Sequence, residues 1–105
     1  MWPRIAEISY KEANDIVHYD RKTGQLHWRA LASRKGAVAH KNASGYMIVT
    51  LKGRPYPVQR IAWLLMHRKM PAHEIDHINA NRTDNRASNL RAATRSQNER
   101  YKHRA

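Results

Sequence analysis

The sequence has no cysteine and no phenylalanine, few acidic residues and no long hydrophobic run. Without cysteine there are no disulfides, no thiolate zinc site and no cysteine nucleophile. No apolar segment approaches the length of a membrane span, and the opening residues MWPRIAEISYKE lack the hydrophobic region of a signal peptide. These absences predict a protein that needs no oxidising compartment and no membrane, with the cytoplasm as its expected location.

The shortage of acidic residues produces the strongest bulk signal. Twenty Lys and Arg against eight Asp and Glu give a formal net charge of +12 in 105 residues. A small domain of this charge attracts polyanions, and nucleic acid is the favoured partner. An anionic membrane surface is a competing explanation, but it calls for an amphipathic helix with an exposed apolar face, and none is left once the core is assigned.

Length and a hydrophobic content of 41% predict one domain, 1–105, with a modest core. The expected elements are a short helix over 5–17, a hairpin over 19–29 that turns at 22–24, an excursion over 30–44 without clear periodicity, and strands around a turn at 52–54. The apolar positions Val58, Ile61, Ala62, Leu65 and Met66 then predict an amphipathic helix between Pro57 and Pro71.

The last part of the chain is expected to form strand 74–78, loop 79–85, strand 89–93 and a helix from Thr94 through Asn98. The fold class is therefore α+β: a β-rich segment with a helix, 19–72, packs on the core, and a second module occupies 73–104. There are no repeats and no long linker.

The stretch EIDHINANRTDNRASNL, residues 74–90, carries the candidate chemistry. His77 is a candidate general base, because an imidazole titrates near neutrality. Asp76 is a candidate ligand of a divalent cation, to which Asn98 would add an amide oxygen, and Asn89 would fix the imidazole or the scissile phosphate. Neighbours on a regular strand point to opposite faces, so Asp76 and His77 serve one site only if the strand ends or bulges there.

The run DHINANRTDNRASNLRAATRSQN resembles the core motif of the HNH endonucleases, in the branch found in bacteriophages and intron-encoded homing enzymes. The upstream runs YDRKTGQLHW and GYMIVTLKGRPYPVQRIAWLLMH resemble the segment that precedes the motif in small phage HNH proteins, so the resemblance covers about residues 19–100. It implies the ββα-metal fold for 73–104, with metal binding by Asp76 and Asn98, water activation by His77 and positioning of the catalytic groups by Asn89.

Two departures from the family pattern accompany this resemblance. Gln59 stands where these proteins commonly have His, a position to which we assign no catalytic role. The larger homing enzymes add a C-terminal DNA-recognition module, which this chain does not include, so a protein partner is expected to supply high sequence specificity.

The remaining polar residues receive plainer interpretations. Asn79, Asn81, Asp84 and Asn85 are interpreted as loop formers, with Asp84 and Glu74 as secondary metal candidates. His67, His73 and His103 lack ligand spacing and are expected on the surface, and Trp28 and Trp63 are expected in the core. The residues expected to bind backbone phosphate are Arg54, Arg60, Arg82, Arg86, Arg91, Arg95, Arg100 and Lys102.

The sequence thus predicts a metal-dependent HNH endonuclease that acts on double-stranded DNA. Carboxylate and amide oxygens are hard donors, which favours one Mg²⁺ or Mn²⁺ per site. The resemblance implies 5′-phosphate and 3′-hydroxyl products and a phage origin within a bacterial host. A monomer would nick and a homodimer would cut both strands. The alternative is a non-catalytic basic nucleic-acid-binding protein on the same scaffold. An RNA-binding or ribosome-associated protein is disfavoured because it gives the Asp76, His77, Asn89 and Asn98 set no purpose.

Overall fold

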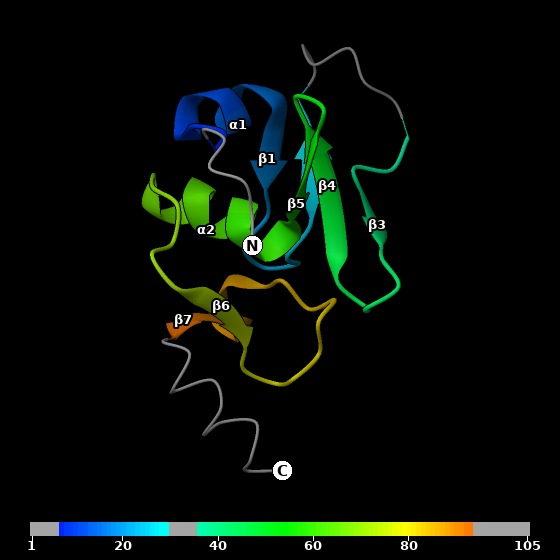
Figure 1. Ribbon diagram of the computed structural model, residues 1–105, viewed down its shortest axis with the longest axis vertical. Coiled ribbons are helices and arrows are strands. Elements are labelled where there is room, and N and C mark those ends of the chain that lie inside the picture. The colour runs from blue at the N-terminus through cyan, green and yellow to red at the C-terminus, as the bar shows by residue number, and fades with distance from the viewer. Residues whose placement is uncertain (1–6, 30–35, 94–105) are drawn as a thin grey trace.

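The computed structural model describes residues 7–29 and 36–93, which form a mixed α/β fold with antiparallel strands (Figure 1). The elements follow in the order α1 (Tyr10–Ile16), β1 (Val17–Tyr19), β2 (Leu26–Trp28), β3 (Ala39–Lys41), β4 (Met47–Leu51), β5 (Arg54–Pro57), α2 (Val58–His67), β6 (Glu74–His77), a 3₁₀ helix (Ala87–Asn89) and β7 (Leu90–Ala93). The strands form three sheets, β1-β2, β3-β4-β5 and β6-β7. No helix among these residues is long and apolar enough to cross a membrane.

Helix α1 begins later than predicted. Ser9 and Glu12 form a capping box, in which the Ser9 hydroxyl accepts from the Glu12 N–H and the Glu12 carboxylate accepts from the Ser9 N–H. Residues 7–9 are therefore not helical, and Ile8 is buried ahead of the helix rather than within it. Lys52, by a side-chain hydrogen bond, and Ser9 lower the pKa of Glu12 to about 2.

The predicted hairpin at 19–29 is confirmed, although its first strand begins two residues earlier, at Val17. Val17 pairs with Trp28, and Tyr19 pairs with Leu26. Gly24 adopts φ +79° in the turn, and its N–H donates to the Asp20 carbonyl. A positive φ favours glycine, which explains this residue at the turn.

The second strand pair is also confirmed, with β4 turning through 52–53 into β5. The excursion predicted for 30–44 contains a further strand, β3, which lies at the edge of this sheet against β4. Its three residues are exposed or half-buried, so they show no apolar periodicity that would predict a strand.

Helix α2 follows Pro57 as predicted and ends at His67, and the capping residue Arg68 adopts the left-handed conformation. Its buried face consists of Val58, Gln59, Ile61, Ala62 and Leu64. The predicted stripe placed Leu65 and Met66 on this face, but both are half-buried and pack against the edge of the core.

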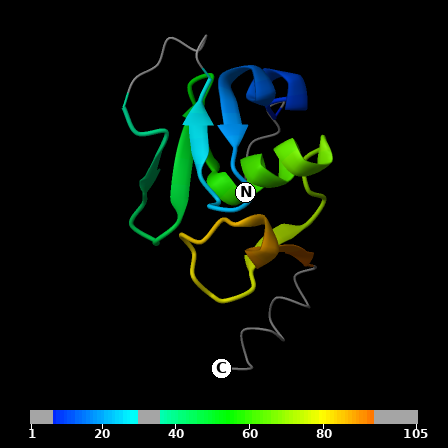
Figure 2. The same ribbon diagram turned by 180° about the vertical axis from the view of Figure 1, so that it is seen from behind.

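The core joins α1, α2 and the first two sheets, and Ile75 and Leu90 extend it into the β6-β7 pair. In both views, α2 lies between α1 above and the β6-β7 pair below (Figures 1 and 2). The β6-β7 ladder is in register from the Glu74–Ala93 pair to the His77–Leu90 pair. The strand ends at His77 without a bulge, and residues 78–86 lead to the 3₁₀ helix. The helix expected from Thr94 lies outside the described residues.

Candidate active site

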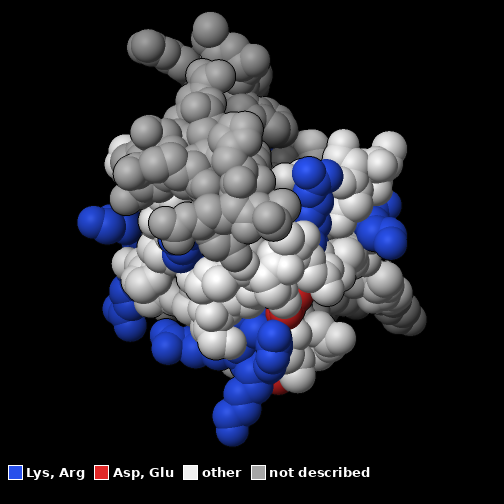
Figure 3. Space-filling model, turned by 90° about the horizontal axis from the view of Figure 1, so that it is seen from below, with Lys and Arg blue, Asp and Glu red and all other residues white. Residues whose placement is uncertain are grey.

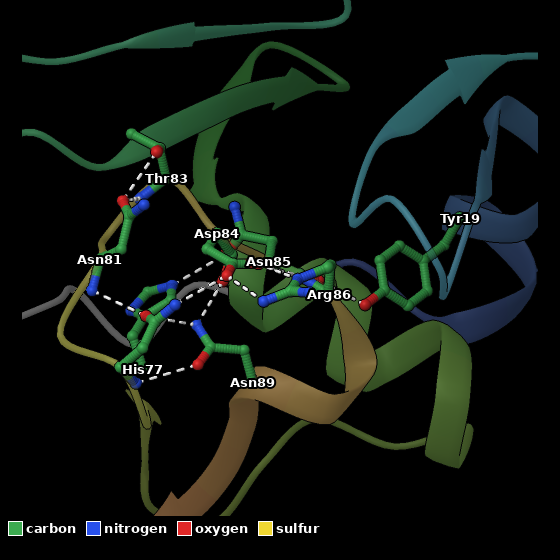
Figure 4. A network of polar contacts seen from close by, with 9 residues as sticks. Tyr19, His77, Asn81, Thr83, Asp84, Asn85, Arg86 and Asn89 are labelled. Atoms are coloured by element: carbon green, nitrogen blue, oxygen red, sulfur yellow. Dashed lines mark hydrogen bonds and ion pairs between the residues drawn. The ribbon is translucent and has the colours of Figure 1, made fainter.

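His77 stands at the last position of β6, where the strand pattern buries Ile75 and His77 on one face. Its side chain is buried, and its Nε2 lies 2.8 Å from Oδ1 of Asn85 (Figure 4). An amide oxygen only accepts hydrogen bonds, so in this contact Nε2 carries the proton. The other ring nitrogen, Nδ1, then keeps a lone pair that can accept a proton.

The partner of His77, Asn85, was predicted only as a loop former. The residue does lie in the loop, but its side chain points inward and it is 2% exposed. Loop sequences are rich in Asn for local reasons, so composition could not distinguish this Asn from its exposed neighbour Asn81. The sequence contained no signal for an Asn85–His77 contact.

Asn89 was predicted to fix the imidazole or the phosphate. In the structure its side chain binds residues of the loop between β6 and the 3₁₀ helix. Its Oδ1 accepts from the Asn79 N–H at 2.9 Å, and its Nδ2 donates to Asn79 Oδ1 at 2.9 Å and to the Asp84 carbonyl at 2.8 Å (Figure 4). Asn89 is buried, and both of its amide hydrogens are used in these bonds. Within the described structure it therefore acts on the backbone of the loop that carries Asn85.

Asp84 and Arg86 form an ion pair in the same loop. Arg86 donates through Nε at 2.8 Å and Nη2 at 2.7 Å, and Asn79 Nδ2 donates to the same carboxylate at 2.8 Å. The Arg86 side-chain hydrogen bonds, more than any other contact, hold the pKa of Asp84 well below its usual range. This carboxylate is saturated by donors, which makes Asp84 a poor cation ligand in this geometry.

Asp76 points to the opposite face of β6 from His77. It stands directly across from Arg91 in the β6-β7 register, and Arg91 Nη2 lies 3.3 Å from its Oδ2. Its side chain is 14% exposed, while Glu74, on the same face, is exposed. Asp76 and His77 can thus meet one substrate only around the end of the strand, because the ladder has no bulge to bring them together.

The described residues contain only part of the predicted metal site. Residues 7–29 and 36–93 contain no group of three or more His, Cys, Asp and Glu that could hold a metal ion. Asn98, the predicted second ligand, lies outside the described residues. The donor types still fit a hard cation, since a carboxylate and an amide oxygen are the ligands that Mg²⁺ and Mn²⁺ accept together with water.

The predicted phosphate-binding arginines differ in how they are held. Arg60 pairs with Glu7 at 2.9 Å, Arg86 with Asp84 and Arg91 with Asp76, and Arg54 is exposed on β5. Arg82, unlike Arg60, Arg86 and Arg91, is held by neutral groups. Its guanidinium lies 4.8 Å from the Tyr46 ring centroid, and Nη1 donates to the Ser44 carbonyl at 2.7 Å. Arg95, Arg100 and Lys102 lie outside the described residues.

Tyr46 lies beside both Arg82 and His77. The Tyr46 and His77 rings lie 6.1 Å apart at a tilt of 42°, and Tyr46 also carries the Arg82 guanidinium. A cation held by an aromatic face and a carbonyl keeps its charge for an incoming anion. Seen from below, Lys and Arg side chains project around the rim of the molecule, and the described atoms in this view show little acidic surface (Figure 3).

The other histidines and tryptophans are consistent with their plainer interpretations. His67 and His73 are exposed, and His103 lies outside the described residues. Trp28 and Trp63 are half-buried and pack against the core.

Residues 56–100 match the model of a protein family described as HNH endonuclease. The match runs from β5 through α2, β6, the 3₁₀ helix and β7, and it includes Asp76, His77, Asn89 and Asn98. Comparison with curated proteins and with solved structures gave no match. The predicted family resemblance is confirmed for this segment, while the hairpin at 17–28 lies upstream of it.

Proposed function

We propose that the protein is a metal-dependent endonuclease that nicks double-stranded DNA, because residues 56–100 match the HNH endonuclease family model. The observation that carries this proposal is the state of His77. The imidazole is buried at the end of a strand, its Nε2 is held by Asn85, and its Nδ1 is left to accept a proton. A buried, oriented imidazole has the geometry of a general base.

In the proposed reaction, His77 Nδ1 takes a proton from the water that attacks the scissile phosphate. Asn85 keeps the ring fixed during this transfer through its bond to Nε2. Asn89 holds the loop in place through Asn79 and the Asp84 carbonyl, so it supports the base through Asn85. A general base of this kind accelerates a reaction about 10²–10⁴-fold.

Asp76 and Asn98 would hold one Mg²⁺ or Mn²⁺, with water and substrate oxygens completing the coordination. When bound, the cation supplies positive charge that stabilises the pentavalent phosphate and the leaving 3′ oxygen. Arg91, beside Asp76, holds this carboxylate on the outer face of the β6-β7 pair. Cleavage with departure of the 3′ oxygen leaves 5′-phosphate and 3′-hydroxyl ends.

The basic surface supports DNA as the substrate. Arg82 shares the neighbour Tyr46 with His77, which makes it a good candidate for a phosphate contact next to the scissile bond. Contacts of this kind give affinity without reading sequence. A single site of this type cuts one strand, so a monomer would nick, a homodimer would cut both strands, and a protein partner would supply specificity.

The test is a plasmid assay with the purified protein in EDTA, Mg²⁺ or Mn²⁺. Supercoiled plasmid is expected to become open circular only with metal. The His77→Ala variant is expected to lose this activity while it retards DNA as the wild type does. His73→Ala is the matched control, because His73 is exposed and outside the network, and it should cut normally.

A second outcome would favour the alternative function. If the wild type retards DNA but cuts it under none of these metals, the protein is a non-catalytic nucleic-acid-binding module. The same basic surface would account for that binding, since affinity for phosphates needs no catalytic base.

A further inference from the structure

The β1-β2 hairpin lies outside the segment that matches the endonuclease family, yet it contacts the loop that carries Asn85. The Tyr19 hydroxyl donates to the Asn85 carbonyl (Figure 4), and the Ala87 N–H donates to the Arg21 carbonyl at 3.0 Å. The third contact is a close approach of Gly24, where an added Cβ would lie 2.4 Å from the Asn85 carbonyl carbon. The hairpin and the loop are thus in direct backbone contact.

Tyr19 is suited to hold its partner firmly. The residue is 8% exposed, and burial raises the pKa of its hydroxyl to about 12, so the hydroxyl remains a donor at neutral pH. A buried hydroxyl rarely exchanges its partner for water, because leaving the carbonyl unsatisfied costs the desolvation of both groups.

Asn85 is held at both ends. Tyr19 fixes its backbone carbonyl, and its side chain meets Nε2 of His77. The Asp84 carbonyl, one residue earlier, is held by Asn89. The position of the Asn85 amide, and with it the direction of the His77 ring, therefore depends on a hydroxyl from the far end of the chain.

We propose that Tyr19 is a positioning residue of the endonuclease: it fixes Asn85 and, through Asn85, the direction in which His77 presents Nδ1. This inference rests on the proposed function. It adds a residue of the β1-β2 hairpin, upstream of the family segment 56–100, to those that position the proposed general base.

The test compares Tyr19→Phe with Tyr56→Phe. Tyr56 is a matched control, because it is 9% exposed and its hydroxyl accepts from the Ile8 N–H at 3.2 Å in the core. Each variant removes one buried hydroxyl and keeps the ring, so both should lower the melting temperature slightly. Only Tyr19→Phe is expected to lower kcat, by about tenfold or more, since a small misplacement of a catalytic group is costly. Its Kd for DNA, measured in EDTA, should stay within about twofold of the wild type, as a loss of positioning alone predicts.

A second readout needs no cleavage. In the metal-free protein, NMR should show a slowly exchanging Nε2–H proton of His77, which Asn85→Leu abolishes because leucine offers no acceptor. Tyr19→Phe should broaden this signal, and Tyr56→Phe should preserve it. Asn85→Asp keeps an acceptor oxygen and should restore both the signal and much of the activity.

The outcomes separate the two proposals. If the wild type does not cut DNA, the proposed function fails, and the NMR comparison still decides whether Tyr19 controls His77. If the wild type cuts DNA and Tyr19→Phe matches Tyr56→Phe in kcat and in the His77 signal, the hairpin is only structural and the positioning role is overturned.

Discussion

Replacing Asn89 with alanine tests whether this buried side chain holds the loop that carries Asn85. The change removes the bonds to the Asn79 N–H, the Asn79 side chain and the Asp84 carbonyl. Each net hydrogen bond contributes about 1 kcal/mol, and buried partners left without a bond add to the cost, so the free energy of unfolding should fall by about 2–4 kcal/mol. Urea denaturation at pH 7 measures this change.

Asn81→Ala is the matched control for this experiment. Asn81 lies in the same loop, but it is exposed, and its Oδ1 accepts from Thr83, at 3.1 Å from the N–H and 2.8 Å from the hydroxyl. Water replaces such bonds readily, so the control should cost less than about 1 kcal/mol. Equal costs for the two variants would refute the assignment of Asn89 as the residue that holds the loop.

Asn89→Asp sharpens the same test, because it keeps the shape of the side chain and removes the donor. Its carboxylate would face the Asp84 carbonyl, which lies 2.8 Å from Nδ2 in the wild type. At pH 7 this variant should be at least as unstable as Asn89→Ala, since two acceptors then oppose each other. Only the protonated acid can donate to the Asp84 carbonyl, so the folded-state pKa of the new carboxyl lies above the unfolded-state value. The protonated carboxyl therefore stabilises the Asn89→Asp variant fully below the carboxyl's unfolded-state pKa, and this stabilisation is lost as the pH rises. Lowering the pH from 7 to 5 should thus stabilise Asn89→Asp relative to Asn89→Ala.

Further predictions concern DNA binding, alkaline stability and the hairpin contact. Arg82→Ala should weaken DNA binding and reduce the slope of log Kd against log salt concentration by about 1, whereas Arg86→Ala, whose cation is already paired with Asp84, should change the slope less; equal slopes would contradict this difference. The pKa of Tyr19 is raised from 10.0 to about 12, so its contribution to stability is present below pH 10 and is lost as the pH rises to 12. The unfolding free energy of the wild type relative to Tyr19→Phe should therefore fall by about 2 kcal/mol over this range, which removes the small advantage of the wild type, and a constant difference would be the opposing result. Gly24→Ala and Gly53→Ala strain similar backbones, at φ +79° and +77°, but of the two only the Cβ at Gly24 would meet backbone atoms, at 2.4 Å. Gly24→Ala should therefore lower the free energy of unfolding by about 1–3 kcal/mol more than Gly53→Ala, as measured by urea or thermal unfolding. Equal costs would mean that the backbone moves apart at Gly24 without loss of stability.

The sequence predicted the elements that carry local signals. Pro57 and the apolar spacing after it predicted α2, and Gly24 and Gly53 marked the two hairpin turns. Strand β3 was missed because three exposed or half-buried edge residues leave no periodic pattern. The start of α1 was placed too early because apolar periodicity continued upstream of the Ser9 capping box, although Ser9 and Glu12 were visible as a capping signal.

The candidate site was predictable as far as its motif extends. The adjacent Asp76 and His77 stood out because of their spacing to Asn89, and the family match includes them. Asn85 and Tyr19 could not be predicted, since their roles come from tertiary contacts rather than from local sequence. The pairing of Asp84 with Arg86, two residues apart in a loop, likewise depends on a backbone conformation that composition does not specify.

The distance along the chain between Tyr19 and Asn85 has a consequence for how the protein folds. His77 and Asn85 are 8 residues apart, whereas Tyr19 and Asn85 are 66 residues apart. Closing the longer loop costs about 2 kcal/mol more in chain entropy, so we expect this contact to form after the intervening elements have packed. The His77–Asn85 pair can form transiently in a partly folded chain, but its final geometry is a late product of folding. The proposed cleavage activity is therefore expected only in the completely folded protein.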